Sequence, residues 1–125
     1  MTDYTATCAC GGLKIDCQGE PQAVVQCHCK DCKKRTGSPF GVGIYYALDD
    51  VTIKGVSQRY VRKALSGADF IQFHCPKCAT TLYWQTDRHP EGLGIAYGCV
   101  EGMDRPPDRT VFEQDRCSWV QQLDI

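Results

Sequence analysis

The pattern of apolar and polar positions along the chain is mostly that of short β-strands. Leu13, Ile15 and Cys17 alternate with Lys14 and Asp16, which is typical of a strand with one buried face. Short runs rich in branched and aromatic residues, separated by Gly, Pro and Asp, predict further strands at 23–26, 41–48, 51–53, 59–63, 69–73, 82–84 and 94–97. Short helices are expected near 31–35 and 118–122. The pattern therefore indicates a mostly β fold of short antiparallel strands with little helix.

Two further expectations concern packing. The segment from Glu101 onward contains Pro106-Pro107 and is expected to begin as a surface loop, which Phe112 and Trp119 would then anchor to the body. Tyr45 and Tyr46 are adjacent on a predicted strand, so one should face inward and the other outward. The aromatic side chains of the 69–73 and 82–84 strands are interpreted as core: Phe70, Phe73, Tyr83 and Trp84.

Length and charge narrow the class of protein. A chain of 125 residues fits a single domain over 1–125. Its formal net charge of −1 argues against a nucleic-acid-binding protein, because such proteins usually carry a strongly basic face. No stretch approaches the roughly 20 apolar residues of a membrane span, and the first residues lack the pattern of a signal peptide. We expect a cytoplasmic protein with no membrane association, and no protein partner can be inferred from the sequence.

The ten cysteines are the feature that points to chemistry. In a reducing compartment, clustered cysteines are more typical of metal sites than of disulfides. Cys75-Pro76-Lys77-Cys78 has the spacing of a zinc knuckle, and Cys8 and Cys10 would face the same side of a strand. Together, Cys8, Cys10, Cys75 and Cys78 predict a closed, structural zinc site.

The middle cluster has a different number of ligands. Cys27, Cys29 and Cys32 offer three sulfurs, while His28 should point to the opposite face of the chain. Three protein ligands leave a fourth position for water or substrate, which is the pattern of a catalytic zinc. A ligand from elsewhere in the fold would close the site, and four residues are candidates for that role: His74, His89, Cys99 and Cys117. Otherwise the lone cysteines Cys17, Cys99 and Cys117 are interpreted as small buried side chains.

Basic residues surround this middle cluster. Lys30, Lys33, Lys34 and Arg35 are opposed only by Asp31. Such cations favour the thiolate form of cysteine and attract anionic substrates, although lysines beside a turn are often simply solvated.

The order and spacing of three motifs resemble one known family. The motifs are Cys8-Ala9-Cys10-Gly11, then Cys27-His28-Cys29-Lys30-Asp31-Cys32-Lys33-Lys34-Arg35-Thr36-Gly37, and then Phe73-His74-Cys75-Pro76-Lys77-Cys78-Ala79-Thr80. This arrangement looks like that of the glutathione-dependent formaldehyde-activating enzymes and the related centromere protein V-like domains. The family pattern usually has Gly where Ala79 stands. It often has a His-hydrophobic-Phe element where this chain reads Arg109-Thr110-Val111-Phe112.

The resemblance implies a β-tent-like fold with two Zn²⁺ per chain. It implies a structural zinc at Cys8, Cys10, Cys75 and Cys78 and a reactive zinc at Cys27, Cys29 and Cys32. It also implies a carbon–sulfur lyase that joins glutathione and formaldehyde into S-hydroxymethylglutathione, so the expected partners are a small thiol and an aldehyde. Lys30, Lys33, Lys34 and Arg35 would then contact the carboxylates of glutathione, and Thr36 or Asp31 could relay a proton. The alternative is a non-catalytic binding module with two structural zinc sites.

Overall fold

The computed structural model describes residues 3–125 and contains short strands, one α-helix and three single-turn 3₁₀ helices. Strands make up 41% of the chain and helix 13%, so the predicted mostly β fold is confirmed. The elements follow in the order β1 (Tyr4–Thr7), β2 (Lys14–Cys17), β3 (Ala23–Cys27), α1 (Lys30–Thr36), β4 (Gly41–Ala47), η1 (Leu48–Asp50), β5 (Val51–Lys54), β6 (Gln58–Lys63), β7 (Asp69–His74), β8 (Thr81–Gln85), β9 (Gly92–Ala96), η2 (Tyr97–Cys99), β10 (Arg109–Val111) and η3 (Glu113–Asp115).

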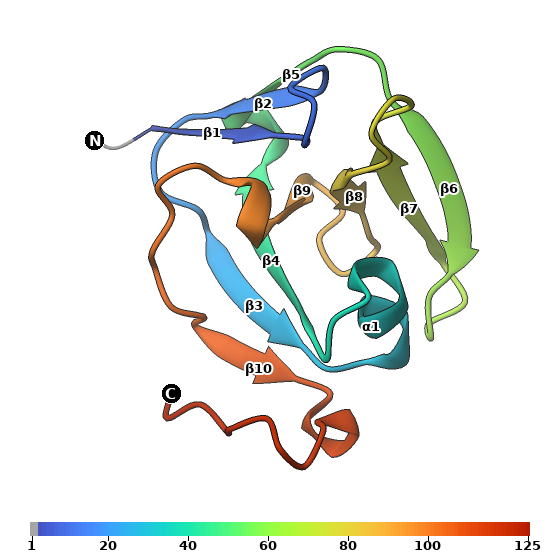
Figure 1. The fold of residues 1–125 in the computed structure, drawn as a ribbon, viewed down its shortest axis with the longest axis vertical. Helices are drawn as coiled ribbons and strands as arrows, with labels where there is room; N and C mark the ends of the chain where they lie inside the picture. Colours follow the sequence, from blue (N-terminus) through green and yellow to red (C-terminus); the bar gives the residue numbers. More distant parts are fainter. Residues whose placement is uncertain (1–2) are drawn as a thin grey trace.

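The strands form two sheets. The smaller has the order β1-β2-β5, and the larger has the order β10-β3-β4-β9-β8-β7-β6. Every strand pair is antiparallel except β10 with β3, which is parallel. In Figure 1, α1 lies between the β3–β10 side of the large sheet and the β6–β7 hairpin. This helix is the one predicted near 31–35.

The core fills the space between the two sheets. Ile15 of β2 and Ile44 and Tyr46 of β4 are completely or almost completely buried in one apolar cluster. The Tyr46 hydroxyl donates a hydrogen bond to the Gly19 carbonyl oxygen at 2.8 Å, which satisfies its polar end in the interior. Tyr45 points to the other face of the large sheet and stays half-buried, as the alternation of a strand requires.

The two terminal regions differ from the sequence expectations. Strands β1 and β10 were not predicted, because neither has a clear apolar alternation. Residues 118–122 form turns and irregular chain, so the helix predicted there is wrong. Trp119 is 75% exposed and does not anchor the tail; Val120, at 8% exposed, is the buried residue of that segment. Within residues 3–125, no helix combines the length and apolar character needed to cross a bilayer.

Candidate metal centres and the cleft beside them

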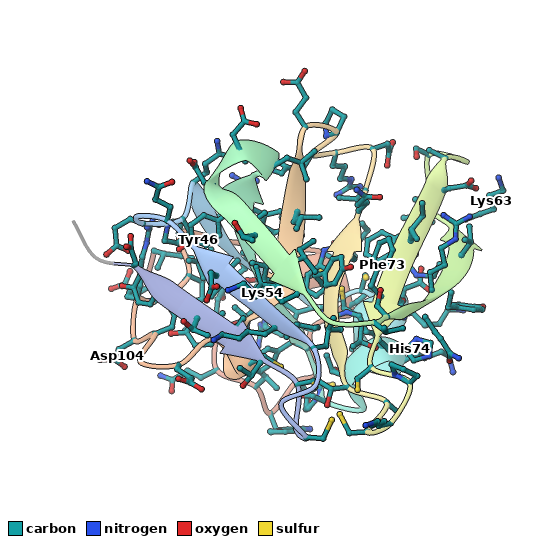
Figure 2. The ribbon with its side chains drawn as sticks, turned by 90° about the horizontal axis from the view of Figure 1, so that it is seen from above. Tyr46, Lys54, Lys63, Phe73, His74 and Asp104 are labelled. Carbon is teal, nitrogen blue, oxygen red and sulfur yellow. The ribbon has the colours of Figure 1, made fainter. Side chains whose placement is uncertain are left out.

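The first cysteine cluster joins two distant turns. Cys8 and Cys10 were predicted on a strand, but they lie in the turn after β1. Cys75 and Cys78 lie in the turn between β7 and β8. The Sγ atoms of Cys8 and Cys10 are 3.7 Å apart, and those of Cys10 and Cys75 are 3.6 Å apart. A tetrahedral zinc ion with Zn–S bonds of about 2.3 Å places its sulfurs about 3.8 Å apart. The spacing therefore fits a four-sulfur site, and Figure 2 shows sulfur atoms gathered near His74 where the two turns meet.

Thr80 connects the two halves of this cluster. Its hydroxyl oxygen accepts a hydrogen bond from the Ala9 N–H at 3.1 Å and lies 3.3 Å from Cys78 Sγ. The hydrogen bond with Thr80 lowers the pKa of Cys78 to about 5, which favours the thiolate that a metal requires. Ala79 has a φ of +64°, a left-handed conformation that glycine adopts without strain. Glycine, which the family resemblance leads us to expect at this position, would adopt this conformation without strain.

The second cluster forms where β3 runs into α1. Cys27 ends β3, Cys29 is the N-cap of α1, and its Sγ accepts a hydrogen bond from the Cys32 N–H at 3.3 Å. The three sulfurs lie within 4.8 Å of one another. His28 points away from them: it is fully buried, and its Nε2 lies 3.2 Å from the side-chain nitrogen of Gln26. Both cysteine clusters could thus hold a metal ion.

The residues after the second cluster end the helix. The Thr36 hydroxyl donates to the Cys32 carbonyl oxygen at 2.8 Å and accepts from the Ser38 N–H at 3.0 Å. Gly37 has a φ of +70°, and its N–H bonds the Lys33 carbonyl oxygen at 2.7 Å. Thr36 thus caps the helix and does not line the cleft described below.

The structure of residues 3–125 brings no fourth side-chain ligand to the three sulfurs. Among residues 3–125, no other Cys, His, Asp or Glu side chain places a ligand atom within 4.8 Å of all three. Of the candidates from sequence, His89 lines the neighbouring cleft, and His74, Cys99 and Cys117 are half-buried elsewhere. Hydrogen bonding from Cys27 and the nearby positive charge of Arg35 lower the pKa of Cys32 to about 6. Within residues 3–125, the cluster thus offers three sulfurs, one of them with a lowered pKa, and no fourth Cys, His, Asp or Glu ligand.

A cleft of about 580 Å³ opens beside these three cysteines. Its charged lining consists of five basic residues and two acidic ones, namely Lys30, Arg35, Arg62, Arg88, Arg109, Asp31 and Asp115. This formal excess of three positive charges favours anionic ligands.

Only two of the four predicted basic residues reach the cleft. Lys30 and Arg35 line it, whereas Lys34 is exposed outside it and Lys33 donates from Nζ to the Asp115 carbonyl oxygen at 2.6 Å. The sequence analysis missed three cleft arginines. Arg62 comes from β6, Arg88 from the loop after β8, and Arg109 from β10. No local motif marks these arginines.

Aromatic rings hold two of the guanidinium groups in place. Arg35 lies over the Trp84 ring at 4.1 Å from its centroid, and Arg62 lies over the Phe70 ring at 3.9 Å. Arg62 also pairs with Asp31 at 3.2 Å, which joins β6 to α1 across the cleft. The interpretation of Phe70 and Trp84 as core alone was incomplete: Trp84 is only 2% exposed, yet both residues line the cleft.

Three glycines let these groups approach the sheet, and two of them, Gly41 and Gly43, line the cleft. A Cβ at Gly41 would lie 2.6 Å from Arg35 Nη2, and one at Gly43 would lie 2.8 Å from Trp84 Cζ2. A Cβ at Gly94 would lie 2.1 Å from Trp84 Nε1. No larger residue fits at these positions without moving the arginine or the indole.

Comparisons with known proteins agree with this geometry. The family model described as glutathione-dependent formaldehyde-activating enzyme matches residues 3–115. A search of curated proteins finds no match. A crystal structure of a Rhodobacter sphaeroides protein, a structural-genomics target, superposes with a TM-score of 0.61 at 20% identity, covering 80% of this chain and 90% of that one. At this identity the match shows a shared fold.

Proposed function

This chain belongs to the glutathione-dependent formaldehyde-activating enzyme family, and we propose that it is a zinc-dependent carbon–sulfur lyase. Its reaction would join glutathione and formaldehyde, or a related thiol and aldehyde, into an S-hydroxyalkyl adduct. One observation carries the proposal: three clustered cysteine sulfurs, without a fourth ligand in residues 3–125, lie in the wall of a positively charged cleft.

The two clusters would have different tasks. Cys8, Cys10, Cys75 and Cys78 supply four thiolates, which saturate a zinc ion and leave no position for substrate. Cys27, Cys29 and Cys32 would hold the second zinc ion. When bound there, this ion would supply a Lewis acid that lowers the pKa of a substrate thiol, so that thiolate forms at neutral pH.

The charged lining of the cleft suits glutathione, which carries two carboxylates and one ammonium group. Guanidinium groups bind carboxylates through paired hydrogen bonds, and Arg88 and Arg109 are both exposed at the cleft without an ion pair in the described residues. Asp115 offers a carboxylate for the ammonium group. The sulfur then attacks the carbonyl carbon, a C–S bond forms, and the C=O electron pair moves to oxygen. That oxygen takes up one proton and the thiol loses one, so the reaction needs no oxidant and no net proton.

The test compares the wild-type protein with two cysteine variants. Cys29→Ser removes a ligand of the open cluster, and Cys117→Ser is the matched control because Cys117 lies outside both clusters. Metal content is measured, and exchange NMR gives the rate at which glutathione and formaldehyde interconvert with S-hydroxymethylglutathione. We expect two zinc ions and accelerated exchange for wild type and Cys117→Ser, and one zinc ion without acceleration for Cys29→Ser. A wild-type protein with two zinc ions that leaves exchange at the buffer rate would instead favour the non-catalytic binding module.

A further inference from the structure

Strand β4 presents the side chain of Tyr45 to the cleft. Its alternation puts Ile44 and Tyr46 in the core and Gly41, Gly43 and Tyr45 on the cleft face. Tyr45 leans back along its own strand, because its hydroxyl oxygen lies 3.3 Å from the Cβ position of Gly43. The ring therefore extends over Gly43 toward the cysteines.

The hydroxyl of Tyr45 thus comes near the open cluster. The Cβ position of Gly41, the next residue on the same face, lies 3.3 Å from Cys32 Cβ. Residues two apart on a strand are separated by about 7 Å. Because Gly43 and Gly41 have no side chains, the Trp84 ring and the Arg35 guanidinium lie over this part of the strand: Trp84 Cζ2 is 2.8 Å from the Cβ position of Gly43, and Arg35 Nη2 is 2.6 Å from that of Gly41. Tyr45 and Cys32 both line the same cleft.

Within the part of the chain that the structure describes, the Tyr45 hydroxyl accepts a hydrogen bond but does not donate one. Trp84 Nε1 donates to Tyr45 Oη at 3.3 Å, so the tyrosine oxygen acts as the acceptor. In the described residues, 3–125, no group accepts the hydrogen of the Tyr45 hydroxyl, whereas Tyr46 donates to Gly19 and Tyr97 donates to the Arg105 carbonyl, each at 2.8 Å. Burial raises the pKa of Tyr45, so the hydroxyl keeps its proton at neutral pH.

Neighbouring rings fix the direction of this donor. Tyr45 meets Trp84 edge-on with ring centroids 6.4 Å apart, and it meets His89 edge-on at 5.4 Å. Trp84 is 2% exposed, so the indole itself cannot turn away. A donor held in place before the substrate arrives loses little free energy to reorientation, which is the property of an effective oxyanion-stabilising group.

We propose that Tyr45 is a catalytic residue whose hydroxyl donates a hydrogen bond to the carbonyl oxygen of the aldehyde. This inference rests on the proposed lyase function and names the proton donor of the same site. As the sulfur forms its bond to the carbonyl carbon, the C=O electron pair moves to oxygen, which takes the Tyr45 proton. Tyr45 then takes a proton back from water. Because the thiol had released one proton to water, the reaction consumes no net proton. In the reverse direction, the tyrosinate accepts the hydroxyl proton as the C–S bond breaks.

The test is Tyr45→Phe, which removes the hydroxyl and keeps the ring that packs against Trp84 and His89. Tyr46→Phe is the matched control, since it removes a neighbouring hydroxyl that faces the core. Exchange NMR at saturating glutathione gives the turnover rate, isothermal titration gives the glutathione dissociation constant, and thermal unfolding and zinc content verify the fold. We expect Tyr45→Phe to lower turnover on the order of 100-fold. Its glutathione dissociation constant and its two zinc ions should be unchanged, and Tyr46→Phe should turn over like wild type.

The outcomes separate this inference from the proposed function. If the wild-type protein turns over and Tyr45→Phe turns over within about twofold of it, the role of Tyr45 is refuted while the lyase function stands. A loss of turnover that is matched by an equal loss of glutathione affinity would also refute it, because the hydroxyl would then bind the thiol substrate. If the wild-type protein itself shows no turnover, both the lyase function and the inference drawn from it are refuted.

Discussion

Replacing Gly94 with alanine should destabilise the protein through one identifiable clash. The new Cβ would lie 2.1 Å from Nε1 and 2.4 Å from Cε2 of Trp84, closer than real side-chain contacts allow. Trp84 is 2% exposed, and Gly94 pairs with both Tyr45 and Trp84 in the sheet, so neither the ring nor the strand can move freely. Overpacking of this kind costs about 1–3 kcal/mol. We take the upper end, because three ring atoms, Nε1, Cε2 and Cδ1, would lie within 2.8 Å of the new Cβ.

Part of that cost is offset, since alanine has less conformational freedom than glycine in the unfolded chain by about 0.5–1 kcal/mol. The expected net loss is about 2 kcal/mol, which for a domain of this size lowers Tm by about 8 °C. Thermal unfolding followed by circular dichroism in zinc-containing buffer measures it.

Gly98→Ala provides the matched control for this prediction. Its Cβ would meet no heavy atom within 4 Å, so we expect a Tm equal to or slightly above that of wild type. The reasoning fails if Gly94→Ala and Gly98→Ala unfold within about 2 °C of each other. That result would mean that the Trp84 indole is not held against the strand. It would also weaken the described positions of Arg35 and Tyr45, because both residues contact this indole.

Two further predictions concern the cysteine turns. Cys78→Ser should unfold the protein or lower its Tm far more than Cys29→Ser, because structural zinc in small domains contributes about 10–16 kcal/mol of binding free energy, comparable to the whole stability of a domain; thermal unfolding of both variants with zinc analysis measures this, and equal effects would contradict the division into two kinds of site. Ala79→Gly should raise Tm by about 2–4 °C, because relief of about 1–2 kcal/mol of strain at a φ of +64° exceeds the roughly 0.5–1 kcal/mol of extra unfolded-chain entropy that glycine brings; a lower Tm with both zinc ions still bound would show that this turn is unstrained.

The cysteine clusters could be predicted from sequence because their geometry is local. Spacing within Cys75–Cys78 and Cys27–Cys32 determines which sulfurs can converge, whatever the rest of the fold does. Local context also decides the caps: Gly37 and Thr36 end α1 through hydrogen bonds within a few residues. The positions of β2 to β9 were likewise predictable, since apolar runs and alternation mark buried faces, whereas β1 and β10 lack that signal.

The cleft could not be predicted, because its residues meet only through the sheet. Arg62 and Arg109 come from opposite edge strands, β6 and β10, and neither strand has a motif that marks its arginine as a ligand group. Trp84 fits the pattern of a core residue and is one, and only the tertiary structure shows that one side of its ring supports Arg35. Trp119 was misread because a large aromatic residue normally marks burial, and here its neighbour Val120 is buried instead.

The position of each cluster in the chain gives a physical reason for assigning them different tasks. The first cluster brings together Cys10 and Cys75, which are 65 residues apart, and so links the turn after β1 to the β7–β8 hairpin. The second lies within a six-residue segment, Cys27 to Cys32, whose ends the β3–α1 connection already brings together. Loop-closure entropy grows with the logarithm of loop length, so a metal in the first cluster constrains the unfolded chain by roughly 2 kcal/mol more than one in the second. A metal in the second cluster would therefore be less needed for folding, which agrees with the proposed division of the two clusters into a structural and a reactive site.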